Sequence, residues 1–341
     1  MGISGVRAGN TRRSGLTTLL ALGLPLAVIL LSGSITPAGA ACQGKNFSIT
    51  IPAPAKSQLH TLHAPLLEAW QRLNGTTFQE NSSPGRGGSY AIGNLLLGPD
   101  KECALAAIQV PGLFFLSHVD RKIFSEKDIA PVVFFAYLPH ALWVDKDSPY
   151  QSMDDLVFLA RGTEDKPGIG QLSIAGTGSF TDQHMANLVL SRQSGVPIRY
   201  LPYTSSSEAS DSVKSKRAQA CWGYAMPPES MPGMRPIAIT AQHRSLALPL
   251  TPTFAETGMN ITTGSYLGLT MASSVPEPVR ASVAAQTAAA LSDEKLRYSL
   301  ATSGATLVLL DYDKIDAFMD CRRREAGQFM EDYPLLPAGT R

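Results

Sequence analysis

Strand-like and helix-like segments alternate along most of this chain, and this order constrains its fold more than any other feature. Residues 47–51 alternate between apolar and polar side chains, as a strand does, and residues 60–73 place their leucines on one side of a helix. The runs 103–110 and 130–144 are almost uniformly apolar, which is typical of central strands. The alternation therefore predicts an α/β fold, with helices layered against a sheet.

The rest of the chain continues this order. We expect further strands at 76–80, 172–175, 198–201, 218–224, 236–240 and 266–271, and further helices at 90–97, 152–161, 180–193, 210–216, 278–291, 294–303 and 312–330. A length of 341 residues suits two domains, and 44% hydrophobic against 17% charged residues allows a large core. The formal net charge of +1 gives no electrostatic reason to expect a nucleic-acid partner.

The N-terminus has the pattern of an export signal. Arg7, Arg12 and Arg13 precede an apolar stretch at 16–35, and small residues follow at 37–41. We predict that residues 1–40 are a signal peptide and that the mature protein is periplasmic. The alternatives are a retained membrane anchor and a lipid on Cys42, although Gly39 stands where a lipobox usually has leucine.

Two glycine-rich loops have the character of anion sites. Successive backbone N–H groups in such a loop form a concave site, and a helix that follows adds its positive end. The segment Gly176, Thr177, Gly178 and Ser179 lies between a predicted strand and a predicted helix, and Gly87 belongs to a similar loop at 83–88. Ser179 and Asp182 also have the spacing of a capping box, in which Ser179 caps the helix and Asp182 reaches back. Both roles are compatible.

A series of short motifs points to one receptor family. They are Asp-Ile-Ala-Pro-Val at 128–132, Ala-Gly-Thr-Gly-Ser at 175–179 with His184, Val-Pro-Ile-Arg-Tyr-Leu-Pro-Tyr at 196–203, Arg-Pro-Ile-Ala-Ile-Thr at 235–240, Arg-Ser at 244–245, Leu-Pro at 248–249, Thr-Pro-Thr at 251–253 and Glu-x-Gly at 256–258. In this order they resemble the Bug-type solute receptors of tripartite tricarboxylate transporters. The resemblance is strongest from about Asp128 to Phe318.

This resemblance implies a two-lobed type II periplasmic-binding-protein fold, with a ligand cleft between the lobes. The first lobe is expected at 41–141 and the second at 142–264, and residues 265–341 return to the first lobe and form the C-terminal helices. The resemblance also implies a monomeric receptor that needs no cofactor, captures a small organic carboxylate and delivers it to membrane permease subunits. A receptor that presents its ligand to a sensor kinase is an alternative.

The loop after the first strand departs from the family pattern. In the family, Pro-Phe-x-x-Gly-Gly and a nearby Asp help to hold the ligand, whereas here residues 52–57 read Pro-Ala-Pro-Ala-Lys-Ser, with His60 near the Asp position. The corresponding candidate ligand residues are Ala53, Ala55, Lys56 and Ser57. Lys56 either contacts a ligand carboxylate through its ammonium group or is a solvated lysine of the loop. Thr204 faces the same cleft or belongs to a helix N-cap cluster.

A secreted hydrolase is the main alternative, because Ser179, Asp182 and His184 supply the residue types of a catalytic triad. However, His184 stands five residues from Ser179, whereas neighbours on a helix face are three or four apart. The chain also has no Gly-x-Ser-x-Gly elbow and no His-Glu-x-x-His motif. We therefore predict that the protein is not an enzyme. His60 and His63 have a spacing that metal ligands use, but they are read as a surface pair because no third ligand is evident.

The cysteines Cys42, Cys103, Cys221 and Cys321 allow three disulfide pairings, and the sequence has no Cys-x-x-Cys of a zinc site. Cys42 precedes the first strand and Cys103 begins the strand taken as the third. In a doubly wound lobe these strands are parallel neighbours about 4.8 Å apart, a spacing that suits a disulfide. We predict a Cys42–Cys103 bond. Cys221 and Cys321 are expected on different lobes, as free and buried thiols.

Overall fold

The computed structural model describes residues 46–333, and the predicted signal segment 1–40 lies outside this range. The first lobe is built on strands β1 (Asn46–Ile51), β2 (Thr77–Ser82), β3 (Ala104–Val110), β9 (Gly264–Ala272) and the first part of β4 (Ile129–Asp145), in the order β2-β1-β3-β9-β4. The first three strands are parallel, and β9 runs antiparallel to both β3 and β4. The short strand β10 (Thr306–Leu307) also pairs with β4.

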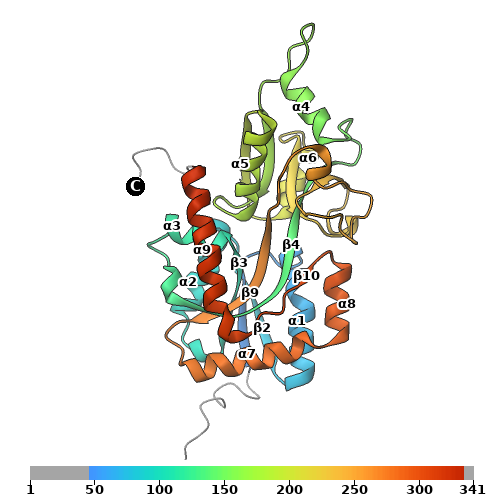
Figure 1. Ribbon diagram of the computed structural model, residues 1–341. Coiled ribbons are helices and arrows are strands. Elements are labelled where there is room, and N and C mark those ends of the chain that lie inside the picture. The colour runs from blue at the N-terminus through green and yellow to red at the C-terminus, as the bar shows by residue number, and fades with distance from the viewer. Residues whose placement is uncertain (1–45, 334–341) are drawn as a thin grey trace, which may run out of the picture. The chain divides into compact units, whose positions relative to one another are not determined.

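The second lobe is built around the second part of β4. This part pairs antiparallel with β7 (Ala220–Tyr224) and β8 (Met234–Ile239). Strand β5 (Leu172–Thr177) then pairs parallel with both β7 and β6 (Ile198–Tyr203). The expected two-lobed α/β fold is confirmed, and β4 runs from one lobe into the other (Figure 1).

Helices cover the sheets of both lobes (Figure 1). They are α1 (Gln58–Asn74), α2 (Ser89–Leu97), α3 (Gly112–Val119), α4 (Met153–Arg161), α5 (Asp182–Ser194), α6 (Ser206–Lys214), α7 (Glu277–Leu291), α8 (Glu294–Thr302) and α9 (Ile315–Asp332). The last three follow β9, and α7 and α8 pack against α1, so the first lobe is built from both ends of the described chain. An ion pair of 2.6 Å between Arg72 of α1 and Asp293 joins the two ends.

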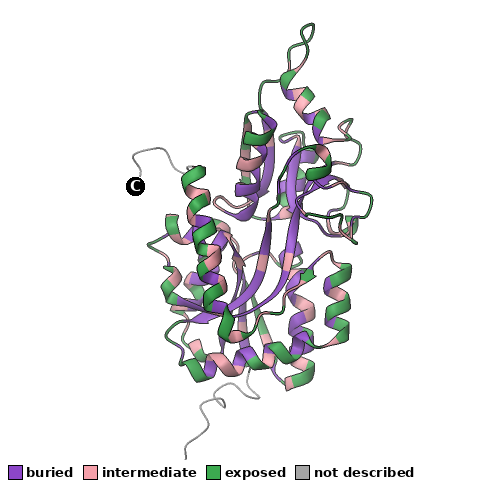
Figure 2. Ribbon diagram, viewed as in Figure 1, coloured by how far each residue is buried: buried purple, intermediate pink, exposed green. Residues whose placement is uncertain are grey.

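Each lobe has its own apolar core. In the first lobe, Trp70 of α1 is fully buried, with its ring centroid 5.5 Å from that of Phe47. In the second lobe, Trp222 is buried with its ring centroid 5.9 Å from that of Phe254. Strands β4 and β9 are buried along almost their whole length, which Figure 2 shows in purple. Burial on this scale explains why these strands read as continuous apolar runs.

Pro139 lies within β4, opposite Gly264 at the end of the β9 pairing, and its carbonyl accepts from Ala225 at 2.9 Å. Two local expectations were wrong. Helix α5 begins at Asp182, and Phe180 has a φ of 59°, which no helix tolerates. The two histidines of α1 do not form a surface pair, since His63 is fully buried while His60 pairs with Glu80 at 2.7 Å.

The cysteines largely follow the prediction. Cys103 is disulfide-bonded, and its predicted partner, Cys42, lies outside the described residues. Cys221 is free and buried, whereas Cys321 is free but only partly buried, because its face of α9 is not fully covered. Among residues 46–333, no helix combines the length and the apolar character that a membrane span needs.

Candidate functional site

A cavity of about 660 Å³, here called the loop cavity, lies where loops of the two lobes meet. The first lobe supplies the loop after β1, the turn at 85–87 before α2, and residues of α3. The second lobe supplies the loops after β5 and β6. Because β1, β5 and β6 run parallel to their neighbours and end at this cavity, it occupies the position where ligands bind in open α/β sheets.

Most of the predicted ligand residues lie together in this cavity. Its lining includes Ala53, Ser57, Gly87, Thr177, Gly178, Ser179 and Thr204. Three others do not line it: Ala55 and Lys56 line a neighbouring groove, and Gly176 lies inside β5. A Cβ atom on Gly176 would stand 2.5 Å from the hydroxyl of Tyr200, so this glycine is required by packing between strands.

Two glycines bring the loops of the two lobes into contact. Gly178 has a φ of +69°, and a Cβ atom there would stand 2.9 Å from the Cα of Gly87. Gly87 has a φ of +64°, and its own Cβ would stand 3.1 Å from the carbonyl oxygen of Ser179. Each position therefore requires glycine for two reasons: its φ is positive, and the backbone of the other loop lies too close for a Cβ atom.

Hydrogen bonds fix the loop after β5. Gly178 N–H donates to the Tyr203 carbonyl at 2.9 Å, and Thr177 N–H donates to the Gln183 side chain at 2.8 Å. The Thr181 hydroxyl closes the turn by donating to the Thr177 carbonyl at 2.7 Å. Among the residues that the structure describes, the amide of Ser179 has no hydrogen-bond partner, and it stands just before the positive end of α5.

Sequence reasoning missed the cation of the loop cavity, Arg86. Its Nε lies 3.2 Å from Asp120 Oδ2, and its Nη2 forms a second, shorter contact with Asp120 Oδ1. Asp120 is almost fully buried and also accepts from Ser89 at 2.6 Å, whereas the Arg86 side chain is 54% exposed. Arg86 is thus held in place with donors left over for a ligand. The loop at 83–88 contains this arginine, but the prediction rested on the glycines beside it.

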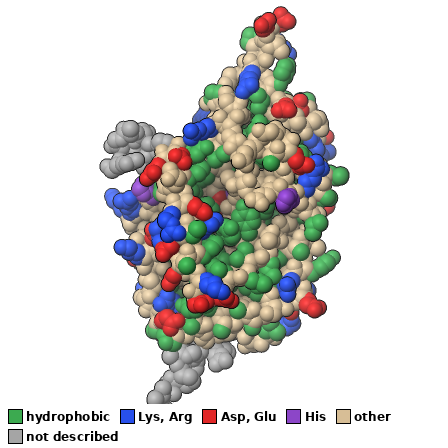
Figure 3. Space-filling model, viewed as in Figure 1, with side chains coloured by type: hydrophobic (Ala, Val, Ile, Leu, Met, Phe, Trp, Pro, Cys, Tyr) green, Lys and Arg blue, Asp and Glu red, His purple; other side chains and the backbone are tan. Residues whose placement is uncertain are grey.

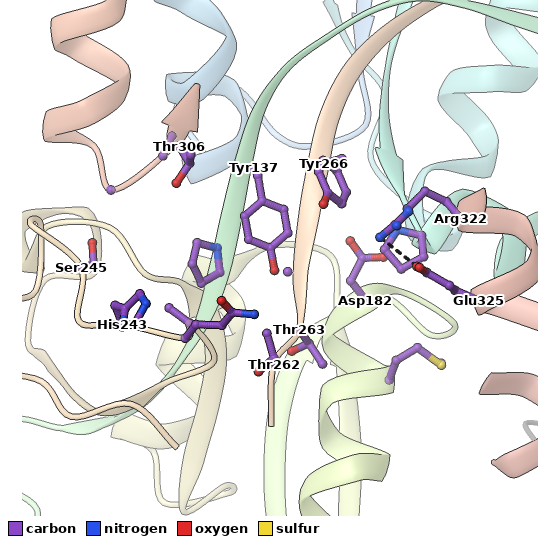
Figure 4. A pocket seen from close by; sticks show the side chains of 18 of the residues that line it. Tyr137, Asp182, His243, Ser245, Thr262, Thr263, Tyr266, Thr306, Arg322 and Glu325 are labelled. Carbon is purple, nitrogen blue, oxygen red and sulfur yellow. Dashed lines mark ion pairs between the residues drawn. The ribbon is translucent and has the colours of Figure 1, made fainter. Parts of the chain in front are cut away.

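A second cavity of about 820 Å³, here called the α9 cavity, lies on the strand face shown in Figure 4. Tyr137 of β4, Tyr266 of β9 and residues of α9 line it, and Figure 3 shows hydrophobic side chains gathered over this face. Both arginines in its lining are ion-paired: Arg322 pairs with Glu325 at 2.8 Å and lies over the Tyr266 ring, and Arg244 pairs with Glu256 at 3.0 Å.

Asp182 joins this strand face to the first turn of α5. It is 4% exposed, and its Oδ2 accepts from Ser265 Oγ of β9, which in turn lies 3.3 Å from Nε2 of the buried His140. Burial raises the pKa of Asp182 to about 6, and the hydrogen bond from Ser265 and the Gly112 amide oppose part of this rise. Burial lowers the pKa of His140 to about 3, so the imidazole is neutral.

The residues of the hydrolase alternative do not form a triad. Ser179 lines the loop cavity, whereas the side chain of Asp182 turns to Ser265 and does not reach back to cap α5. His184 Nδ1 accepts from the Phe180 amide at 3.2 Å, and its ring stacks on Tyr200 at 4.5 Å. The capping-box prediction was therefore wrong, and His184 is a packed, hydrogen-bonded residue.

The chain is similar to proteins of one transport family. Residues 73–334 match the family described as tripartite tricarboxylate transporter family receptors. A protein of the tcbD-tcbE intergenic region of Pseudomonas sp. (strain P51) is 32% identical over 135 residues, 39% of each chain. A protein of the gbd 5' region of Cupriavidus necator is 26% identical over 148 residues, 42% of this chain and 43% of its own. The chain thus aligns with about two fifths of these relatives' length.

Solved structures share the fold at low identity. The periplasmic binding protein BugD matches with a TM-score of 0.74 and 16% identity, over 85% of this chain and 98% of its own. MatC from Rhodopseudomonas palustris with bound malate has a TM-score of 0.72 and 17% identity, over 84% of this chain and 98% of its own. A second protein of R. palustris, with adipate, has a TM-score of 0.74 and 20% identity, over 84% of this chain and 96% of its own.

Proposed function

Because the chain belongs to the family of tripartite tricarboxylate transporter receptors, we propose that it captures a small organic carboxylate in the loop cavity. The observation that carries this proposal is the contact between Gly178 and Gly87 across the two lobes. It brings two turns rich in backbone N–H groups to one place, and such turns bind anions without needing a side-chain charge.

The chemistry of capture follows from the groups around that contact. The unpartnered Ser179 amide and the positive end of α5 stabilise one carboxylate oxygen. Arg86, anchored by Asp120, adds a charge-assisted hydrogen bond from the first lobe. Since donors come from both lobes, a bound carboxylate would favour the arrangement in which the lobes meet.

Two of the similar structures support the ligand class. One holds malate and the other adipate, and both molecules carry two carboxylates. The loop cavity, at about 660 Å³, falls within the range of about 300–1,000 Å³ that is usual for small-ligand sites.

The proposal extends to the organisation of the whole chain. Residues 1–40 act as the export signal, and the mature receptor works as a periplasmic monomer that passes its ligand to permease subunits. We place the first lobe at 41–141 and 265–341 and the second at 142–264, so that the first boundary falls inside β4, the strand that both lobes share. No catalytic role is assigned to Ser179 or His184.

The test is a thermal-shift and calorimetry series with organic acids. A ligand at about 100 times its Kd stabilises the folded form by about 2.7 kcal/mol, so a true ligand shifts the melting temperature clearly. Gly178→Ala should weaken binding at least about tenfold, because the added Cβ pushes the Gly87 loop away. Gly170→Ala is the matched control, since Gly170 has a φ of +78° with open space around it. Equal affinities of the two variants would remove the glycine contact from the site.

A further inference from the structure

The first turn of α5 holds the loop after β5 and strand β9 at the same time. The Thr181 hydroxyl donates to the Thr177 carbonyl, and the Gln183 side chain accepts from the Thr177 amide, so these two residues fix the loop that lines the loop cavity. Asp182 stands between them and turns toward β9 instead, where its Oδ2 accepts from Ser265 (Figure 4). A shift of the Asp182 side chain is therefore passed to the loop after β5 within one helical turn.

Asp182 also joins the two lobes. It belongs to the second lobe, whereas Gly112 of α3 belongs to the first and lies so close that a Cβ atom there would collide with Asp182 Oδ1. Ser265 stands at the start of β9, where the chain passes from the second lobe back to the first. Helix α5 has no side-chain hydrogen bond at its N-cap, Thr181, so the contacts of Asp182 orient the start of this helix.

The carboxyl of Asp182 has no cation to offset its charge. The titratable and charged groups that face it are Tyr137 and His140 of β4, Tyr200 of β6, Tyr224 of β7, Tyr266 of β9, Arg322 and Glu325 of α9, and His243 and Arg244 of the loop after β8. In the part of the chain that the structure describes, both arginines pair with glutamates and neither pairs with Asp182. Burial lowers the pKa of His140 to about 3 and keeps the imidazole neutral. Burial also raises the pKa values of Tyr137, Tyr200 and Tyr224, so their hydroxyls stay protonated near neutral pH.

We propose that Asp182 is a positioning residue of the carboxylate site, and that the receptor takes up a proton on this side chain when it binds its ligand. This inference rests on the proposed function, which places a ligand carboxylate at the amide of Ser179, three residues before Asp182. Two negative charges at the start of one helix repel each other, and a buried site strengthens this repulsion. A proton on Asp182 removes the repulsion and leaves an oxygen that still accepts from Ser265.

Calorimetric titration with malate, succinate and adipate from about pH 5.5 to pH 8, at constant salt, tests this. The Kd of the native protein, divided by that of Asp182→Asn, should rise at least about fivefold over this range, because a bound anion raises the pKa of the buried carboxyl above its value of about 6. Protonation of the acids themselves is common to both proteins and cancels in this ratio. Titration in two buffers of different ionisation heat should show net proton uptake near pH 7 in the native protein, and none in Asp182→Asn.

Two other variants separate positioning from charge. Asp182→Ala should bind more weakly than Asp182→Asn at every pH, because Ser265 then loses the acceptor that anchors the start of α5. His243→Gln is the matched control: it removes an imidazole that lines the same α9 cavity as Asp182, and it should keep the native proton uptake.

The possible failures are distinguishable. If no organic acid binds at any pH, the proposed function is wrong and this inference falls with it. If an acid binds but the native protein and Asp182→Asn show the same pH dependence, or if His243→Gln abolishes the proton uptake, the protonation of Asp182 is overturned and the carboxylate site stands. Equal affinities of Asp182→Ala and Asp182→Asn would overturn the positioning role. Melting curves of each variant separate a lost contact from a lost fold.

Discussion

Asp182 makes the unfolding free energy of this protein depend on pH in a direction opposite to most acidic residues. In an unfolded chain its carboxyl titrates near 3.8, whereas burial raises its pKa in the folded protein to about 6. Between these values the folded state keeps a proton that the unfolded state has lost. Stability from this group is therefore greatest below about pH 4 and falls as pH rises to about 6.

The magnitude follows from the two pKa values. Their difference, at 1.36 kcal/mol per pH unit, is about 3 kcal/mol. Asp182→Asn removes the titration, and its amide oxygen can still accept from Ser265. The unfolding free energy of the variant minus that of the native protein should therefore rise by roughly 2.5 kcal/mol from pH 4 to pH 7.5, since part of the change has already occurred at pH 4. The neutral, buried His63, His140 and His184 lose stability as pH falls, but this effect is common to both proteins and cancels.

Urea unfolding of both proteins at several pH values between about 4 and 7.5 measures this difference. Asp165→Asn, in an exposed loop, controls for the loss of one charge and should show no such trend. If the difference in unfolding free energy between Asp182→Asn and the native protein is the same at every pH, Asp182 is ionised in the folded protein at little cost. The account of its burial would then be wrong.

Two further predictions concern the ligand cation and the core. Arg86→Lys should weaken carboxylate binding about tenfold in calorimetry, because lysine cannot keep both contacts to Asp120 and still face the cavity. The control Arg217→Lys changes an exposed arginine and should leave the affinity unchanged, and equal affinities of the two variants would exclude Arg86 from the site. Trp70→Ala should cost about 3–5 kcal/mol in urea unfolding, since the indole is fully buried between Phe47 and Phe78; a loss under about 1 kcal/mol would mean that this core repacks freely.

Much of the fold could be predicted because its signals are local. Strand β1 alternates between apolar and polar residues and buries Phe47, Ile49 and Ile51, and α1 buries one face, so the period of the sequence reports both directly. Helix α3 was not predicted, because its apolar residues follow the equally apolar β3 and only Pro111 and a glycine mark the end of the strand. Strand β10 is two residues long, and its place depends on pairing with β4.

Only part of the loop cavity follows from local sequence. The turn after β5 could be found because glycines just before a helix start are typical of anion-binding turns. The contact of Gly178 with Gly87 could not, because it joins loops from different lobes. The partner of Asp182 stands 83 residues away on β9, while local spacing offered a nearer role as a cap. Lys56, expected among the ligand residues, has a φ of 65° and lines the neighbouring groove, a position that local sequence does not indicate.

The position of β9 in the first sheet also determines when that lobe can be completed. During synthesis the chain emerges from its N-terminus, so β1, β2 and β3 are available long before residues 264–272. Since β9 inserts between β3 and β4, those early strands keep an unpaired edge until most of the chain has appeared. The first lobe therefore cannot close early, and a chain of this topology stays incompletely folded for nearly the whole time that it is being made.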